Sequence, residues 1–165
     1  MKTAIVLVLI LFSPSSLLAG ENIIDFRLVY ENKLPDTFIV EDEKLGKIIL
    51  GKESIISDSD ILEAKVTIDR EPPPKWVSSA VDKSVGSFKI NEPQIYIDLF
   101  FNRRGKEIFT RVTSENIGKR IAVLIYDEIV MAPRIMDKID SGVARISSGF
   151  TEKEANTIVN SINRR

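Results

Sequence analysis

The 165-residue sequence contains neither cysteine nor histidine. No disulfide can form, so cysteine usage gives no information about the compartment. These absences also remove the thiol nucleophile, the imidazole base and the commonest zinc ligands. We therefore expect no catalytic residue, no metal and no cofactor, and a protein that is not an enzyme. A hydrolase built on Ser, Lys, Asp or Glu is the less favoured alternative, because neither Gly-x-Ser-x-Gly nor Ser-x-x-Lys occurs.

The sequence also lacks an excess of charge of either sign, with 23 basic and 24 acidic residues. A basic footprint for nucleic acid is therefore absent, and we expect no nucleic-acid partner. Two short basic clusters, Arg103–Lys106 and Lys119–Arg120, have acidic residues nearby. Such clusters usually form a solvated surface, and a phosphate site is the alternative interpretation.

Long hydrophobic runs are missing as well, and the longest lies at the N-terminus. Lys2 precedes an apolar run from Ala4 to Phe12, and Pro14, serines and Ala19-Gly20 follow. This order is typical of a secretory signal peptide, and the run is shorter than the roughly 20 residues that span a bilayer. We predict a signal peptide over residues 1–20 and an exported protein, periplasmic or extracellular, with no membrane span after cleavage. An uncleaved anchor is the alternative.

Residues 21–69 read as a β-rich base segment. Apolar and polar residues alternate from Ile24 to Val29 and from Ala64 to Ile68, and two short apolar runs lie between them. Ser57 or Asp58 is expected to cap a brief helix. The carboxylates of this region also resemble a calcium loop, but the glycine and closing acid of such a loop are missing.

Residues 70–93 are expected to form an extended, proline-rich surface loop. Pro72–Pro74 favour a polyproline conformation, which serves either as a stiff connector or as a ligand for another domain. Trp76, the single tryptophan, is expected to hold this loop on the body of the protein or to contact a partner.

Residues 94–165 carry the clearest pattern. The order is a strand over 95–101, a helix capped by Asn102, a buried strand over 121–126, a hairpin strand over 129–131, a short strand over 143–146 and a second helix. Thr151 and Glu154 form a capping box for that helix, and its apolar stripe recurs at helical spacing. The pattern predicts an α+β fold: a ferredoxin-like sandwich whose mostly antiparallel sheet carries two helices on one face.

Several residues are expected to shape the turns around these elements. Gly118, Gly142 and Gly149 suit backbone turns that a side chain would hinder, and Pro133 ends the hairpin strand because it cannot donate a ladder hydrogen bond. Phe150 is expected to pack over the first turn of the last helix.

At these residues the sequence resembles the head of the first periplasmic domain of SecD, in the SecD/SecDF family. The similarity is carried by the runs Ile129–Ile135 and Ile139–Thr151, with Glu154-Ala155-Asn156 after them, and Ile24–Val29 is similar to the domain's opening strand. The resemblance implies a stand-alone exported accessory module that binds exported polypeptide or a translocon component, rather than a catalyst. A structural or regulatory envelope protein that reuses the head fold is the alternative.

A contact surface follows from this resemblance as a hypothesis. We expect it to combine the open side of the sheet with a loop and the proline-rich segment. Its candidate residues are Trp76, Met131, Arg134 and Ile135. Met131 and Trp76 are adaptable or large apolar groups that suit varied unfolded chains, and the alternative is that both simply pack within the fold.

Overall fold

The computed structural model describes residues 22–42, 45–70 and 93–165. The predicted signal peptide, nearly all of the proline-rich loop and Trp76 lie outside the described residues. Predictions about them therefore stay predictions.

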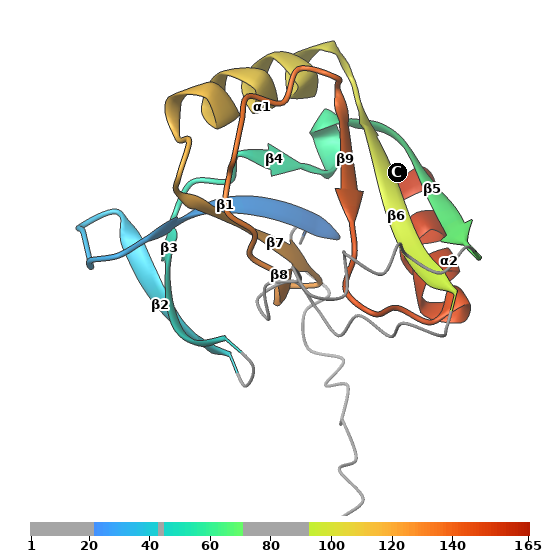
Figure 1. The fold of residues 1–165 in the computed structure, drawn as a ribbon, viewed down its shortest axis with the longest axis horizontal. Coiled ribbons are helices and arrows are strands. Elements are labelled where there is room, and N and C mark those ends of the chain that lie inside the picture. The colour runs from blue at the N-terminus through green and yellow to red at the C-terminus, as the bar shows by residue number, and fades with distance from the viewer. Residues whose placement is uncertain (1–21, 43–44, 71–92) are drawn as a thin grey trace, which may run out of the picture.

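The larger of two antiparallel sheets forms the centre of the molecule (Figure 1). Its strands lie in the order β2-β3-β1-β7-β8, and β4 pairs with β1 beside them. Their bounds are β1 Ile24–Tyr30, β2 Thr37–Asp42, β3 Gly46–Gly51, β4 Ile56–Ser57, β7 Arg120–Ile125 and β8 Glu128–Met131.

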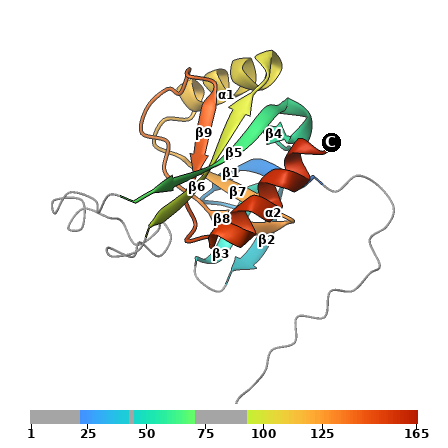
Figure 2. The ribbon, with the colours of Figure 1, turned by 90° about the vertical axis from the view of Figure 1, so that its right-hand side faces the viewer.

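The smaller sheet has three strands in the order β5-β6-β9, and helix α2 packs along β5 and β6 (Figure 2). Helix α1 lies across the other end of β6, next to the short 3₁₀ helix η1 (Figure 1). The bounds are η1 Asp58–Asp60, β5 Ile61–Asp69, β6 Gln94–Phe101, α1 Arg103–Glu115, β9 Val143–Ile146 and α2 Glu152–Asn163.

The predicted α+β class, with antiparallel strands and two helices, is confirmed. The structure adds that the strands after residue 93 divide between two sheets, because β6 pairs with β5 and β9 whereas β7 pairs with β1. Strands from the predicted base segment thus pair with strands from the predicted head, and the boundary between the two segments stays a prediction.

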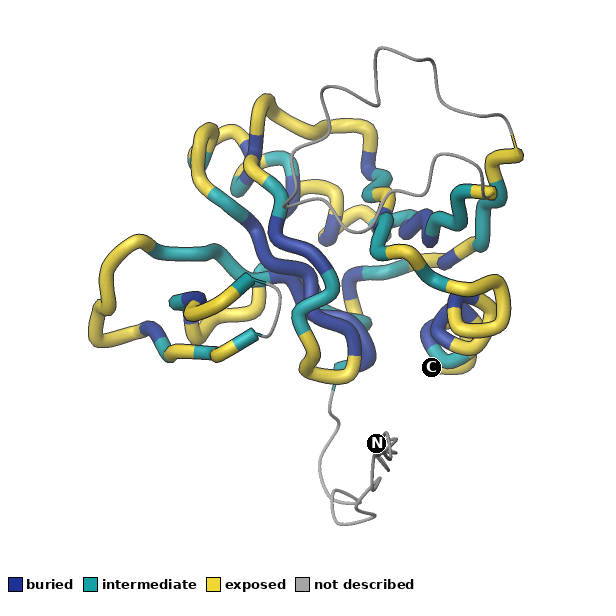
Figure 3. Tube along the Cα trace, turned by 60° about the horizontal axis from the view of Figure 1, so that its bottom comes forward, coloured by how far each residue is buried: buried dark blue, intermediate teal, exposed yellow. Residues whose placement is uncertain are grey.

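Alternation along the strands builds the main hydrophobic core between the sheets and both helices (Figure 3). Three aromatic rings meet there: Phe26 of β1 lies edge-on to Phe109 of α1 at 5.8 Å, and Phe101 of β6 lies 5.0 Å from Phe109. A smaller cluster on the opposite face of the large sheet includes Leu50 and Leu124.

Helix α2 follows the predicted pattern closely. The Thr151 Oγ1 accepts from the Glu154 N–H, and the Glu154 carboxylate accepts from the Thr151 N–H, so the capping box is present. The buried residues are those of the predicted stripe: Ala155, Ile158, Val159 and Ile162.

Helix α1 follows its pattern only in part. The Asn102 side chain caps it by accepting from the Gly105 N–H, and Phe109 is buried as expected. Thr113, which the pattern did not single out, is completely buried, because its hydroxyl can donate to the Phe109 carbonyl one turn back at 2.8 Å.

The predicted turn residues lie at turns. Gly118, Gly142 and Gly149 all have positive φ, a conformation that favours glycine. Strand β8 stops two residues before Pro133, and Phe150 is partly buried against the main core.

Ser57 caps η1 together with the carboxylate of Asp60, as the pattern predicted for this region. The carboxylate of Asp58 has a different role from capping η1. It accepts from the N–H groups of Ile23 and Ile24 at 2.8 and 2.9 Å and pairs with Arg165 at 2.7 Å. Asp58 therefore ties the start of β1 to the end of the described chain.

Candidate functional site

A pocket of about 400 Å³ lies between the two sheets, below helix α1. We call it the inter-sheet pocket. One wall is β9 of the small sheet, the opposite wall comes from β7 and β8 of the large sheet, and the 132–142 loop runs along the side from β8 past α1 to β9 (Figure 1). Its lining is mostly apolar: Phe26, Phe109, Thr113, Ile121, Val123, Met131, Pro133, Ile135, Met136, Ile139, Val143, Ala144 and Ile146, with Arg134, Asp137 and Arg145.

The pocket brings together three of the four predicted contact residues. Met131 and Ile135 are buried members of the main core that line the pocket, whereas Arg134 is exposed at its rim. The Arg134 guanidinium donates to the Gly118 carbonyl, which holds it beside the end of α1. Their contact role stays a prediction, as does that of Trp76.

Main-chain hydrogen bonds fix the 132–142 loop against the segment that follows α1. The Gly118 N–H donates to the Ile135 carbonyl at 2.7 Å, and the Ile135 N–H donates to the Lys119 carbonyl at 2.8 Å. Farther along, the Ile139 N–H donates to the Thr113 Oγ1 at 3.0 Å. Thr113 is therefore a buried anchor of the pocket wall, and no sequence signal beyond its helical spacing from Phe109 pointed to it.

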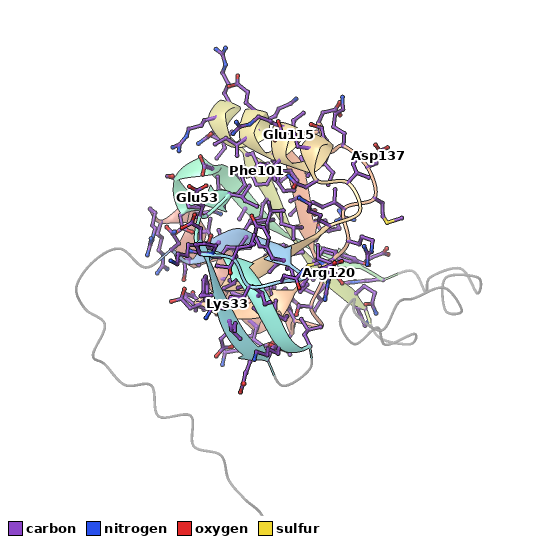
Figure 4. All side chains as sticks on the ribbon, turned by 90° about the vertical axis from the view of Figure 1, so that its left-hand side faces the viewer. Lys33, Glu53, Phe101, Glu115, Arg120 and Asp137 are labelled. Carbon is purple, nitrogen blue, oxygen red and sulfur yellow. The ribbon has the colours of Figure 1, made fainter. Side chains whose placement is uncertain are left out.

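The 132–142 loop brings exposed apolar side chains to the pocket. Met136 is 78% exposed and lines the pocket with Ile139, and Ile117 lies just before the segment bonded to Ile135. Figure 4 labels Asp137 on this loop, beside the end of α1 that carries Glu115. Sequence reasoning missed Met136, because one apolar residue within a charged loop leaves no periodic pattern.

An ion pair between the half-exposed Arg145 and the buried Asp98 supports the β9 wall. The Arg145 guanidinium donates from two nitrogens to the Asp98 carboxylate at 2.7 and 2.9 Å, and Thr67 donates to the same carboxylate at 2.7 Å. The bonds from Arg145 hold the pKa of the Asp98 carboxyl below its usual range. Arg145 also lies over the Tyr96 ring at 4.9 Å, so its side chain is fixed on the open face of the small sheet.

The inter-sheet pocket is an apolar site. Its walls are aliphatic and aromatic, and its charged groups lie at the rim. Within residues 22–42, 45–70 and 93–165, no cluster of three or more acidic side chains could hold a metal ion. Across the same ranges, no helix has the length and apolar character needed to cross a membrane.

This α+β domain, with a pocket between two antiparallel sheets, has clear relatives. The family model for the SecDF P1 head subdomain matches residues 78–164. The chain is 30% identical to the protein translocase subunit SecD of Calditerrivibrio nitroreducens over 131 residues, covering 73% of this chain and 22% of that protein. It is 29% identical to the Rickettsia typhi SecD subunit, covering 81% of this chain and 24% of the relative.

Solved structures agree with the fold. A structure of SecDF, a membrane component that enhances protein export, matches with a TM-score of 0.58 at 20% identity, over 86% of this chain and 61% of that chain. SecDF in a super-membrane-facing form matches with a TM-score of 0.59, over 86% of this chain and 18% of that chain.

The chain belongs to the SecDF P1 head subdomain family. It spans only about a quarter or less of the length of the SecD relatives named above.

Proposed function

We propose that this protein is an exported, non-enzymatic binding module of protein export, and that its inter-sheet pocket holds apolar segments of unfolded exported polypeptides. The observation that carries the proposal is the position of Met131, Arg134 and Ile135 around one apolar pocket. Membership of the SecDF P1 head family supports the link to export, because the relatives are translocase subunits.

The shape of the site suits a varied set of chains. Met136 offers an unbranched, flexible side chain at the mouth of the pocket, and such side chains adapt to differing partners. The apolar walls favour chain segments that a folded protein would bury, so an unfolded polypeptide fits better than a folded one.

The test is a titration with an exported protein kept unfolded by reduction and alkylation, followed by the fluorescence of Trp76 and by anisotropy of a labelled ligand. We expect Met136→Asp to weaken binding by about tenfold, which corresponds to about 1.4 kcal/mol. Leu62→Asp is the matched control, because Leu62 is 75% exposed on β5 and does not line the pocket.

Two results would contradict the proposal. One is the absence of binding by the wild-type protein in both measurements. The other is an equal loss in the two variants, which would mean that the pocket has no special part in binding. Binding of one folded envelope protein in place of unfolded chains would favour the alternative of a structural or regulatory role.

A further inference from the structure

Strand β9 forms one edge of the small sheet and pairs with β6 on its other side. The Phe101 N–H donates to the Gly142 carbonyl at 2.9 Å, just before β9 begins. In an antiparallel ladder, residues alternate between those that bond to the neighbouring strand and those whose main-chain groups point away. In the observed register, Ala144 therefore bonds to β6, and Val143 and Arg145 direct their N–H and C=O groups outward.

These outward groups are weakly used. The Val143 N–H donates to the Ser141 Oγ, and the Val143 carbonyl accepts from the same exposed hydroxyl, both at a long 3.3 Å. Among the described residues, no hydrogen bond beyond the ladder engages the main chain of Arg145. Main-chain groups at a sheet edge that are unpaired, or held only by one exposed hydroxyl, are a template for another strand.

The open edge faces the inter-sheet pocket, and β8, an edge strand of the large sheet, lies across it. The Ser148 hydroxyl donates to the Val130 carbonyl of β8 at 2.8 Å, so the two walls are joined beyond the end of β9. The Ile139 bond to Thr113 fixes the 132–142 loop where it lies against α1. The pocket is therefore a slot along β9, and a strand paired with all four residues of β9 would extend for roughly 13 Å.

We propose that an extended polypeptide segment binds in this slot as an additional β-strand on the outer edge of β9. Its main chain bonds to Val143 and Arg145, and every second side chain points into the apolar pocket. Main-chain pairing is largely independent of sequence, and the pocket adds a preference for apolar residues at alternate positions. This inference rests on the proposed function and specifies how the polypeptide is held.

A proline at position 145 tests the pairing, because it removes the outward donor and no ladder bond. Arg145→Ala is the matched control, since both variants lose the ion pair to Asp98. The probe is a fluorescein-labelled decapeptide of alternating Val and Ser with a lysine at each end, measured by anisotropy. We expect Arg145→Pro to bind at least tenfold more weakly than Arg145→Ala.

Backbone methylation of the probe gives a second test that leaves the protein unchanged. Two peptides carry N-methyl groups, one on every valine and the other on every serine. Only one set of amides faces β9, so one peptide should lose at least tenfold in affinity for the wild-type protein and the other should bind like the parent. This comparison also decides the question if Arg145→Pro fails to fold by circular dichroism.

Equal binding by Arg145→Ala and Arg145→Pro, both folded, with equal binding of both methylated peptides, would overturn strand pairing and leave the proposed function standing. Failure of the parent peptide and of unfolded polypeptide to bind would overturn both. Sedimentation tests a further outcome. If the wild type is a dimer and Arg145→Pro is a monomer, the β9 edge pairs with a second copy of the chain, and the inference is overturned.

Discussion

The two edges of the small sheet are treated differently. At the β5 edge, the Asn163 carboxamide accepts from the Ala64 N–H at 2.8 Å and donates to the Ala64 carbonyl at 2.9 Å. One side chain thus takes both bonds that a neighbouring strand would make to Ala64. At the β9 edge, Arg145 has no such main-chain partner among the described residues, and the edge borders a pocket.

The two edge strands differ in length, since β5 has nine residues and β9 has four, and the longer edge is the one with a side-chain block. Long exposed edges invite pairing with other chains, and native proteins block them with side chains or helices. Here the end of α2 blocks β5 at Ala64 and leaves the short edge of β9 open. Each prediction below changes residues near one of the two edges and compares the result with a control.

The largest effect is expected where β5 begins. A Cβ on Gly105 would lie 2.4 Å from the Asp60 carbonyl oxygen, and this backbone atom cannot move cheaply. We expect Gly105→Ala to lower the free energy of unfolding by about 3 kcal/mol, measured by urea denaturation.

Gly142→Ala, just before β9, is the matching glycine substitution at the other edge of the small sheet, and we expect it to destabilise the fold less than Gly105→Ala. A Cβ on Gly142 would meet the flexible side chain of Lys106 at 2.9 Å, so the main cost is the positive φ of 77°, about 1 kcal/mol. A Gly105→Ala cost no larger than that of Gly142→Ala would contradict the tight contact at β5.

Removing the edge block should have the next largest effect. Asn163→Ala deletes two hydrogen bonds at roughly 1 kcal/mol each, so we expect a loss of about 2 kcal/mol and stronger self-association in sedimentation. Asn160→Ala is the control, since Asn160 is exposed on the same helix, and it should change stability by less than about 0.5 kcal/mol. Equal losses in the two variants would refute the block.

The cap at the start of α2 supports the block from the other end of the helix. Thr151→Ala should cost about 1 kcal/mol, the usual penalty for losing an N-cap side chain. Thr157→Ala, a change at an exposed position within the helix, is the comparison for denaturant midpoints. An unchanged midpoint and slope for Thr151→Ala would reject the cap.

The smallest effect concerns the ion pair behind the open edge. Arg145 lowers the pKa of Asp98, so this carboxylate stabilises the fold above its unfolded pKa of about 3.9, and the contribution is lost as the pH falls through the lower folded value. We expect the free energy of unfolding at pH 7 to be higher for the wild type than for Asp98→Asn by less than about 1 kcal/mol. The difference is small because Arg145 is half exposed. Urea unfolding should show this gap shrinking at pH 2.5, and a constant gap would contradict the pair.

Local patterns predicted much of this fold. The capping box of α2, its buried stripe and the turn at Gly118 depend on residues close in sequence, and all three lie where expected. The division into two sheets was not predicted, because strand partners such as β1 and β7 lie far apart in sequence. Periodicity shows which face of a strand is buried and not which strand lies beside it.

Three of the four residues expected to contact a partner line the inter-sheet pocket, and their contact role stays a prediction. Met131, Arg134 and Ile135 share one stretch of sequence, so the resemblance to the family located them together. The pairing of Asp98 with Arg145, the anchor at Thr113 and the edge block at Asn163 join residues that are 47, 26 and 99 positions from their partners. Such contacts depend on tertiary packing and leave no local signal.

Amide hydrogen exchange, followed by NMR, tests the contrast between the two edges most directly. In the free protein, the Ala64 amide should be protected and the Arg145 amide should exchange quickly. Addition of the Val-Ser decapeptide should protect Arg145 and leave Ala64 unchanged. An Arg145 amide that stays unprotected at saturating peptide, while binding is confirmed by anisotropy, would contradict strand addition at β9.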